Sequence, residues 1–218
     1  MAVKLVVFDL DGTLADAAED LTTAANALVS EIDPGAPPLS VDEVRRFIGD
    51  GAAILVGRIL GSRGLETPKE TLLPRCLVHY KAHLLDKTRL YPGVLEALDA
   101  LGGTPLAVLT NKPGDLSRTI LKGLGIASRF FRTLGGGDVR ERKPDPAGLL
   151  SLAREAGVSP AETAMVGDSA VDVRTGRAAG ATTVGVLYGF DPDGVRGERP
   201  DHLAMTPGEI PLLLLGSP

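Results

Sequence analysis

The chain has 218 residues, of which 44% are hydrophobic and 23% charged, and its formal net charge is −5 at pH 7. This composition excludes a disordered chain and predicts one substantial core with a smaller accessory unit. The acidic balance and the low aromatic content, with no Trp, argue against nucleic acid or an anionic membrane as partner, because both need a basic surface. Any anionic ligand would have to be held by a local cluster of charges.

Short apolar runs alternate with helical patterns along most of the chain. We expect strands at residues 3–8, 106–110, 131–134, 163–166 and 182–186. Helical patterns fall at residues 93–101, 115–124, 146–156 and 170–179. Dense apolar runs of this kind are typical of parallel strands buried on both faces. The alternation predicts an α/β fold with a doubly wound, Rossmann-like parallel sheet.

One long region, residues 15–90, breaks this alternation. We find no convincing strand in it, whereas helical patterns recur at residues 17–32, 41–47, 52–60 and 69–85. A Tyr-Pro-Gly sequence at 91–93 marks the return to the α/β pattern. We therefore predict an all-helical cap at 15–90, inserted into an α/β core formed by residues 1–14 and 91–218.

Polar residues follow the predicted strands at the edge where open α/β sheets bind ligands. Four of them are acids, namely Asp9, Asp11, Asp168 and Asp172. Four ionised carboxylates at one edge need compensating charge, and Mg²⁺ suits them because it prefers oxygen ligands and shares them with substrate phosphates. Lys143 would add positive charge. Donors to phosphate oxygens are expected from Thr110 and from the backbone around Gly12 and Asn111.

The spacing of Asp9 and Asp11 indicates a division of labour. Residues two apart at a strand end can face one cavity, so that one carboxylate attacks phosphorus while the other moves protons. We expect Asp9 to be the nucleophile that forms an acyl phosphate. Asp11 would protonate the leaving oxygen and afterwards activate water. The pattern therefore predicts phosphoryl transfer through a phosphorylated aspartate.

Four ordered motifs resemble those of the haloacid dehalogenase superfamily. They are DLDGT at 9–13, LTN at 109–111, KPDP at 143–146 and GDSAVD at 167–172. The resemblance covers nearly the whole chain, and Asp11 favours the phosphatases and phosphomutases of the superfamily over its dehalogenases. It implies that Asp9 is nucleophile and metal ligand, and that Asp11 is the acid/base whose backbone carbonyl also binds the metal. Asp168 resembles the remaining protein ligand to Mg²⁺.

The same resemblance assigns roles to the other polar residues. Thr110 and Asn111 match the pair that binds phosphate. Lys143 matches the lysine that binds both the phosphate and the nucleophile. We expect Asp172 to position Lys143 or a metal-bound water.

A narrower resemblance is to the phosphoglycolate phosphatases. Besides the cap, it rests on the segments 45–60, 109–113 and 188–190. In that family an Ile-Gly-x-Gly segment, here 48–51, and a following arginine, here Arg58, lie on the cap side facing the site. The family usually has Ser where this chain has Ala17, which puts one substrate or cap contact in question. The resemblance implies a Mg²⁺-dependent phosphatase of a small phosphorylated metabolite, with 2-phosphoglycolate as the leading substrate.

Other functions stay open at this stage. A sugar phosphomutase of the β-phosphoglucomutase type shares the fold and the phosphoaspartate, and a phosphatase of this kind could act on another small ester, a nucleotide or pyrophosphate. A non-catalytic domain that binds phosphorylated ligands is an alternative from a different class. Loss of Asp9 or Asp11 would be the expected sign of such a domain, and both acids are present.

The cysteine content and the apolar runs indicate the cellular compartment in which the protein is expected. A single cysteine, Cys76, excludes an internal disulfide and a cysteine metal cluster. No basic leader precedes the first apolar segment, and the longest later run, at 210–215, is too short to span a bilayer. We expect a cytoplasmic protein, and the sequence leaves both a monomer and a homodimer open.

Overall fold

A six-stranded parallel sheet in the order β5-β4-β1-β6-β7-β8 forms the centre of the core. The computed structural model describes residues 2–216. The strands are β1 (Leu5–Phe8), β4 (Leu106–Pro113), β5 (Arg132–Gly136), β6 (Thr163–Gly167), β7 (Thr182–Val186) and β8 (His202–Ala204). All four residues of β1 are buried, which accounts for the unbroken apolar runs of the sequence. The predicted doubly wound α/β fold is confirmed.

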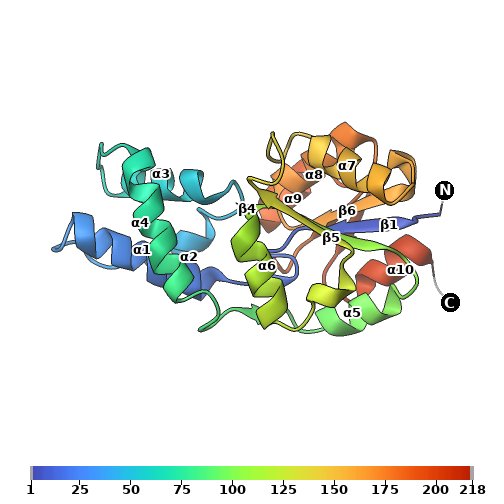
Figure 1. Cartoon of the computed structure of the whole chain (residues 1–218), viewed down its shortest axis with the longest axis horizontal. Helices are drawn as coiled ribbons and strands as arrows, with labels where there is room; N and C mark the ends of the chain where they lie inside the picture. Colours follow the sequence, from blue (N-terminus) through green and yellow to red (C-terminus); the bar gives the residue numbers. More distant parts are fainter. Residues whose placement is uncertain (1, 217–218) are drawn as a thin grey trace.

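Helices cover both faces of this sheet (Figure 1). The side chains of β1 alternate between the two faces, as the pleat of a strand requires. Val6 and Phe8 join the cluster that includes α5 (Val94–Ala100), α6 (Gly114–Gly123) and α10 (Glu209–Leu215). Leu5 and Val7 pack with α7 (Ala147–Glu155) and α8 (Ala170–Ala179), and α9 (Pro192–Glu198) contacts α8. Each large side chain buried in this way contributes about 1.5–3 kcal/mol.

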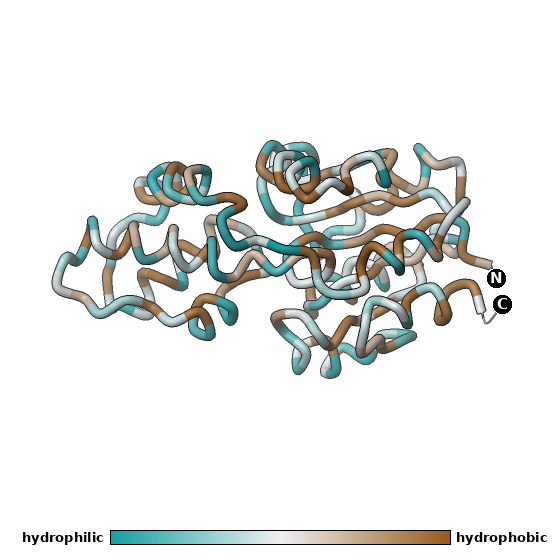
Figure 2. Tube along the Cα trace, turned by 90° about the horizontal axis from the view of Figure 1, so that it is seen from below, coloured by the Kyte–Doolittle hydropathy of each residue, from teal (hydrophilic) through white to brown (hydrophobic). Residues whose placement is uncertain are grey.

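The helical cap lies at one end of the sheet, at the left of Figure 1. It consists of α1 (Ala18–Ile32), α2 (Val41–Arg45), α3 (Ala52–Ser62) and α4 (Lys69–Ala82). A separate cluster that includes Leu28, Val56, Leu72 and Cys76 packs α1, α3 and α4 together. Hydrophobic residues of the core follow the strands, and both described ends of the chain lie at the end away from the cap (Figure 2). No helix within residues 2–216 has the length and apolar character needed to cross a membrane.

Two very short strands join cap and core. β2 (Ala15–Asp16) and β3 (Arg89–Leu90) pair in the antiparallel direction, next to the expected limits of the cap at 15 and 90. The expectation that residues 15–90 contain no strand is therefore wrong at its two ends. A two-residue strand is too short to show any periodicity, so it cannot be recognised from the sequence pattern.

Asp20 fixes the start of the cap to this junction. Its carboxylate, which is 1% exposed, accepts hydrogen bonds from the backbone N–H of Lys87 at 2.9 Å and of Thr88 at 2.8 Å. The hydroxyl of Thr88 donates a third at 2.7 Å. The first helix of the cap is thereby tied to the segment that returns to the core.

Replacing Asp20 by Ala should lower the free energy of unfolding by about 3 kcal/mol, because hydrogen bonds to a buried charge are lost and two N–H groups are left without partners. Urea unfolding at neutral pH measures the change. Glu66→Ala, at an exposed cap position, is the control and should change stability by less than about 0.5 kcal/mol. An equally small effect of Asp20→Ala would show that the junction does not depend on this carboxylate.

Candidate active site

The carboxyl ends of three neighbouring strands bring the predicted residues together. Asp9 directly follows β1, Thr110 lies within the second half of β4, and Asp168 directly follows β6. Because β4, β1 and β6 are parallel and adjacent, these positions meet at one edge of the sheet. The three residues are only 3–5% exposed. This edge faces the cap.

Lys143 is enclosed between two carboxylates. Its Nζ lies 2.9 Å from Oδ1 of Asp9 and 2.6 Å from Oδ1 of Asp172. Burial acts to lower the pKa of Lys143, but the charges of Asp172 and Asp9 outweigh it and raise the pKa, so the ammonium stays protonated. Asp172 is fixed in turn by Ser169, whose hydroxyl donates to Oδ2 at 2.6 Å at the start of α8. Asp172 therefore lies beside Lys143, which is one of the two neighbours that we expected for it.

The acids at this edge carry more negative charge than Lys143 balances. Asp9, Asp168 and Asp172 are buried and offer carboxylate oxygens within 4.8 Å of one another. Burial raises the pKa of Asp9 to about 6, with a further rise from Asp172, although Lys143 acts to lower it. Burial and the charge of Asp172 raise the pKa of Asp168 well above its ordinary value. A hard divalent cation among these oxygens would supply the missing positive charge, so the residues fit a metal site.

The loop after β1 and the segment after β7 hold Asp168 in place. The hydroxyl of Thr13 donates to Oδ1 of Asp168 at 3.3 Å, and the N–H of Phe190 donates to Oδ2 at 2.7 Å. Gly12 has φ +83°, and a Cβ at this position would lie 2.0 Å from Oδ2 of Asp168. Its N–H donates to the carbonyl of Ala15 at 2.9 Å. Gly12 is thus needed for the close approach to Asp168, and its N–H is not the free phosphate donor expected from the sequence.

Asn111 links the core to the cap. Its amide group donates to the carbonyl of Gly49 at 3.3 Å and to that of Lys143 at 3.1 Å. An amide nitrogen carries two protons, so both donors of Asn111 serve these carbonyls rather than a phosphate. The side chain of Asn111 therefore positions the cap loop and the lysine loop, and the donor to phosphate that we expect at this position is its backbone N–H.

Arg58 lies apart from the nucleophile. Its guanidinium pairs with Asp50 at 2.5 Å and donates to the carbonyl of Phe47 at 3.0 Å. It lines a cavity of about 360 Å³ next to the one that contains Asp9, and Gly49 borders both. The structure thus places Arg58 on the cap but does not bring it to the acids.

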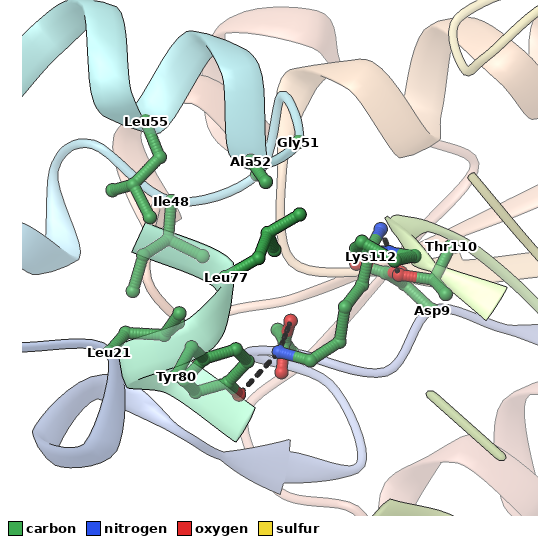
Figure 3. A pocket seen from close by; sticks show the side chains of 13 residues that line it. Asp9, Leu21, Ile48, Gly51, Ala52, Leu55, Leu77, Tyr80, Thr110 and Lys112 are labelled. Carbon is green, nitrogen blue, oxygen red and sulfur yellow. Dashed lines mark hydrogen bonds and ion pairs between the residues drawn. The ribbon is translucent and has the colours of Figure 1, made fainter. Parts of the chain in front are cut away.

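Lys112 is a residue of the site that the sequence analysis did not assign. Its Nζ lies 2.8 Å from Oδ2 of Asp11 and 2.6 Å from the hydroxyl of Tyr80 on α4. Figure 3 shows the ammonium of Lys112 directed at this hydroxyl. Position 112 lies within the segment 109–113 that supports the narrower resemblance, and this was the available signal. The contact with Tyr80 depends on how the cap packs, and the sequence does not show that.

Comparison with known proteins shows the family to which the chain belongs. The model of the haloacid dehalogenase-like hydrolases matches residues 6–186. The chain belongs to the haloacid dehalogenase-like hydrolase family. A phosphoglycolate phosphatase of Rhodospirillum rubrum is 40% identical over 201 residues, which cover 88% of this chain and 83% of that protein. One of Chromobacterium violaceum is 39% identical over 194 residues, which cover 86% of each chain.

A solved structure agrees with these matches. The crystal structure of a predicted phosphoglycolate phosphatase from Haemophilus somnus superposes with a TM-score of 0.88 at 32% identity, over 95% of this chain and 96% of that one. The resemblance to superfamily phosphatases expected from the four motifs is confirmed, as is the prediction that the chain is an enzyme of phosphatase type. The buried acids add support for a metal-dependent enzyme.

Proposed function

We propose that the chain is a Mg²⁺-dependent phosphomonoesterase that acts through a phosphorylated Asp9, with 2-phosphoglycolate as its substrate. The observation that carries the proposal is the buried arrangement of Asp9 and Lys143, 2.9 Å apart, with Asp11 lining the same cavity as Asp9. A carboxylate nucleophile needs a fixed cation beside it to accept a phosphate dianion, and Lys143 is that cation.

A metal ion would bind to the carboxylates of Asp9 and Asp168 and to the backbone carbonyl of Asp11. When bound, Mg²⁺ neutralises phosphate oxygens and so lowers the repulsion between the ester and Asp9. The cluster that includes Asp9 and Asp168 supports this assignment, because Lys143 alone does not balance its negative charge.

The residues of the chain have separate roles in the two chemical steps. An oxygen of Asp9 forms a bond to phosphorus as the bond to the leaving oxygen breaks, and Asp11 gives its proton to that oxygen. Asp11 next takes a proton from water, which attacks the phosphoaspartate and regenerates Asp9. Lys143 keeps its positive charge throughout, and Thr110, which borders the cavity, donates to a phosphate oxygen.

The cavity supports a small substrate. It has a volume of about 50 Å³, and the cap contributes mostly apolar side chains to it, among them Ile48, Leu55 and Leu77. These apolar side chains offer no hydrogen-bond partners to the hydroxyl groups of a hexose, so the lining favours a short ester over the substrates of a sugar phosphomutase. The relatives named phosphoglycolate phosphatase support the same substrate.

Release of inorganic phosphate from a panel of esters tests the proposal. The panel contains 2-phosphoglycolate, a hexose phosphate, a nucleoside monophosphate and pyrophosphate, each with Mg²⁺ and with a chelator. We expect Mg²⁺-dependent turnover with the largest kcat/KM for 2-phosphoglycolate. No release from any ester by the folded protein in Mg²⁺ would refute a phosphatase, and equal values across the panel would refute the substrate assignment.

Protons should compete with Mg²⁺ at this site. In the metal-free protein the pKa of Asp9 is about 6, against an ordinary value of 3.8. A carboxyl group whose pKa is higher in the folded than in the unfolded chain stabilises the fold. This stability is fully present below the unfolded pKa and is lost as the pH rises through the folded pKa. Mg²⁺ should therefore raise the unfolding temperature more at about pH 7.5 than at about pH 5, as measured by calorimetry. Asp9→Asn should reduce this difference, and an equal effect of Mg²⁺ at both pH values would contradict the argument.

A further inference from the structure

Lys112 is the only cationic side chain among the described residues that line the Asp9 cavity. It is 6% exposed, so its charge is largely out of solvent. The cap lines the same cavity with apolar groups, including Leu21 and Leu77, which are labelled in Figure 3. A cation in such surroundings is costly unless it is paired, and any anion that enters the cavity meets it.

The position of Lys112 relative to Asp11 sets what it can contact. Its Nζ is 2.8 Å from the carboxylate of Asp11, which serves the leaving oxygen in the proposed reaction. The group attached to that oxygen must consequently lie beside Lys112. A carboxylate one carbon away from the ester oxygen falls within reach of the ammonium.

The ammonium retains a donor for such a group. Nζ carries three protons, of which one is directed to Asp11 and one to the hydroxyl of Tyr80 at 2.6 Å. Tyr80 also presents its ring 4.4 Å from Nζ, which fixes the ammonium from the cap side. The third proton is left for a ligand.

We propose that Lys112 is the residue that selects for a carboxylate on the leaving group. The substrate class is a short phosphoester whose carboxylate is separated from the ester oxygen by one carbon. This inference rests on the proposed function, because it assumes that Asp11 serves the leaving oxygen. Other groups bind the phosphate of the substrate, so Lys112 binds its carboxylate.

The test compares two esters that differ only in this charge, 2-phosphoglycolate and the phosphate ester of glycolamide. Each is assayed with the native chain and with Lys112→Met, which keeps the length of the side chain. We expect the native chain to prefer phosphoglycolate by about 10- to 100-fold in kcat/KM, the range for loss of a charged hydrogen bond. Lys112→Met should reduce this preference to about twofold, mainly through a higher KM for phosphoglycolate.

The double comparison separates recognition of the carboxylate from any effect on Asp11. A change in Asp11 alone would lower kcat for both esters equally and leave their ratio unaltered. Lys112→Arg keeps the charge and should retain much of the preference. Lys81→Met, at an exposed position on α4, is the control and should leave the ratio as in the native chain.

The outcomes distinguish this inference from the proposed function. A native chain that releases no phosphate from either ester overturns both. A native chain that prefers phosphoglycolate, with the same preference in Lys112→Met, overturns only the role of Lys112. If Lys112→Met does not fold, inhibition of the native chain decides: glycolate should inhibit at least about tenfold more strongly than glycolamide, and equal inhibition would overturn the inference.

Discussion

Replacing Asp9 by Asn should lower kcat for phosphate release by about 10⁴-fold or more, since the variant lacks the carboxylate that forms the acyl phosphate. The fold should survive the change. Asn has nearly the same shape, and Lys143 keeps its contact with Asp172 at 2.6 Å. A loss of activity without a loss of structure would identify Asp9 as the reacting group.

The phosphorylated intermediate gives a second measurement. After an acid quench during turnover, the intact mass of the native chain should include a fraction heavier by one phosphoryl group, and Asp9→Asn should lack it. Asp193→Asn is the matched control, because the side chain of Asp193 is 96% exposed, and its kcat should stay within about twofold of the native value. A phosphorylated Asp9→Asn chain would mean that another residue is the nucleophile.

The regular part of the fold could be predicted from the sequence. The expected strand 182–186 and helix 170–179 coincide with β7 and α8. Their limits could be predicted because the apolar pattern of the sequence changes clearly at the ends of both segments. β8, α9 and α10 were not predicted. β8 has three residues, one of them His202, and shows no apolar run. In α10 Pro211 lies in the first turn, where its missing N–H costs nothing.

The candidate site also has a part that could be predicted from the sequence and a part that could not. Asp9, Thr110 and Asp168 come together because parallel strand ends meet, which the order of strands and motifs makes predictable. The neighbours of Asn111 and Lys112 could not be predicted, since both contact the cap, and the packing of an inserted domain depends on tertiary contacts. The cap therefore adds to the site what the motifs alone do not describe.

Lys143→Met should lower kcat by about 10³-fold at saturating Mg²⁺, because the variant lacks a fixed charge that stabilises the transferring phosphoryl group. It should also destabilise the metal-free protein by about 3–5 kcal/mol, since Asp9 and Asp172 would remain buried without their partner. Lys122→Met, at an exposed position of α6, is the control for both measurements.

A double variant separates these two effects of Lys143. Adding Asp172→Asn to Lys143→Met removes one of the two uncompensated charges, so much of the lost stability in urea unfolding should return. The activity should not return, because no cation is restored beside Asp9. If kcat recovered together with stability, Lys143 would act only by holding Asp9 and Asp172 in place, and the stabilising charge would have to come from the metal alone.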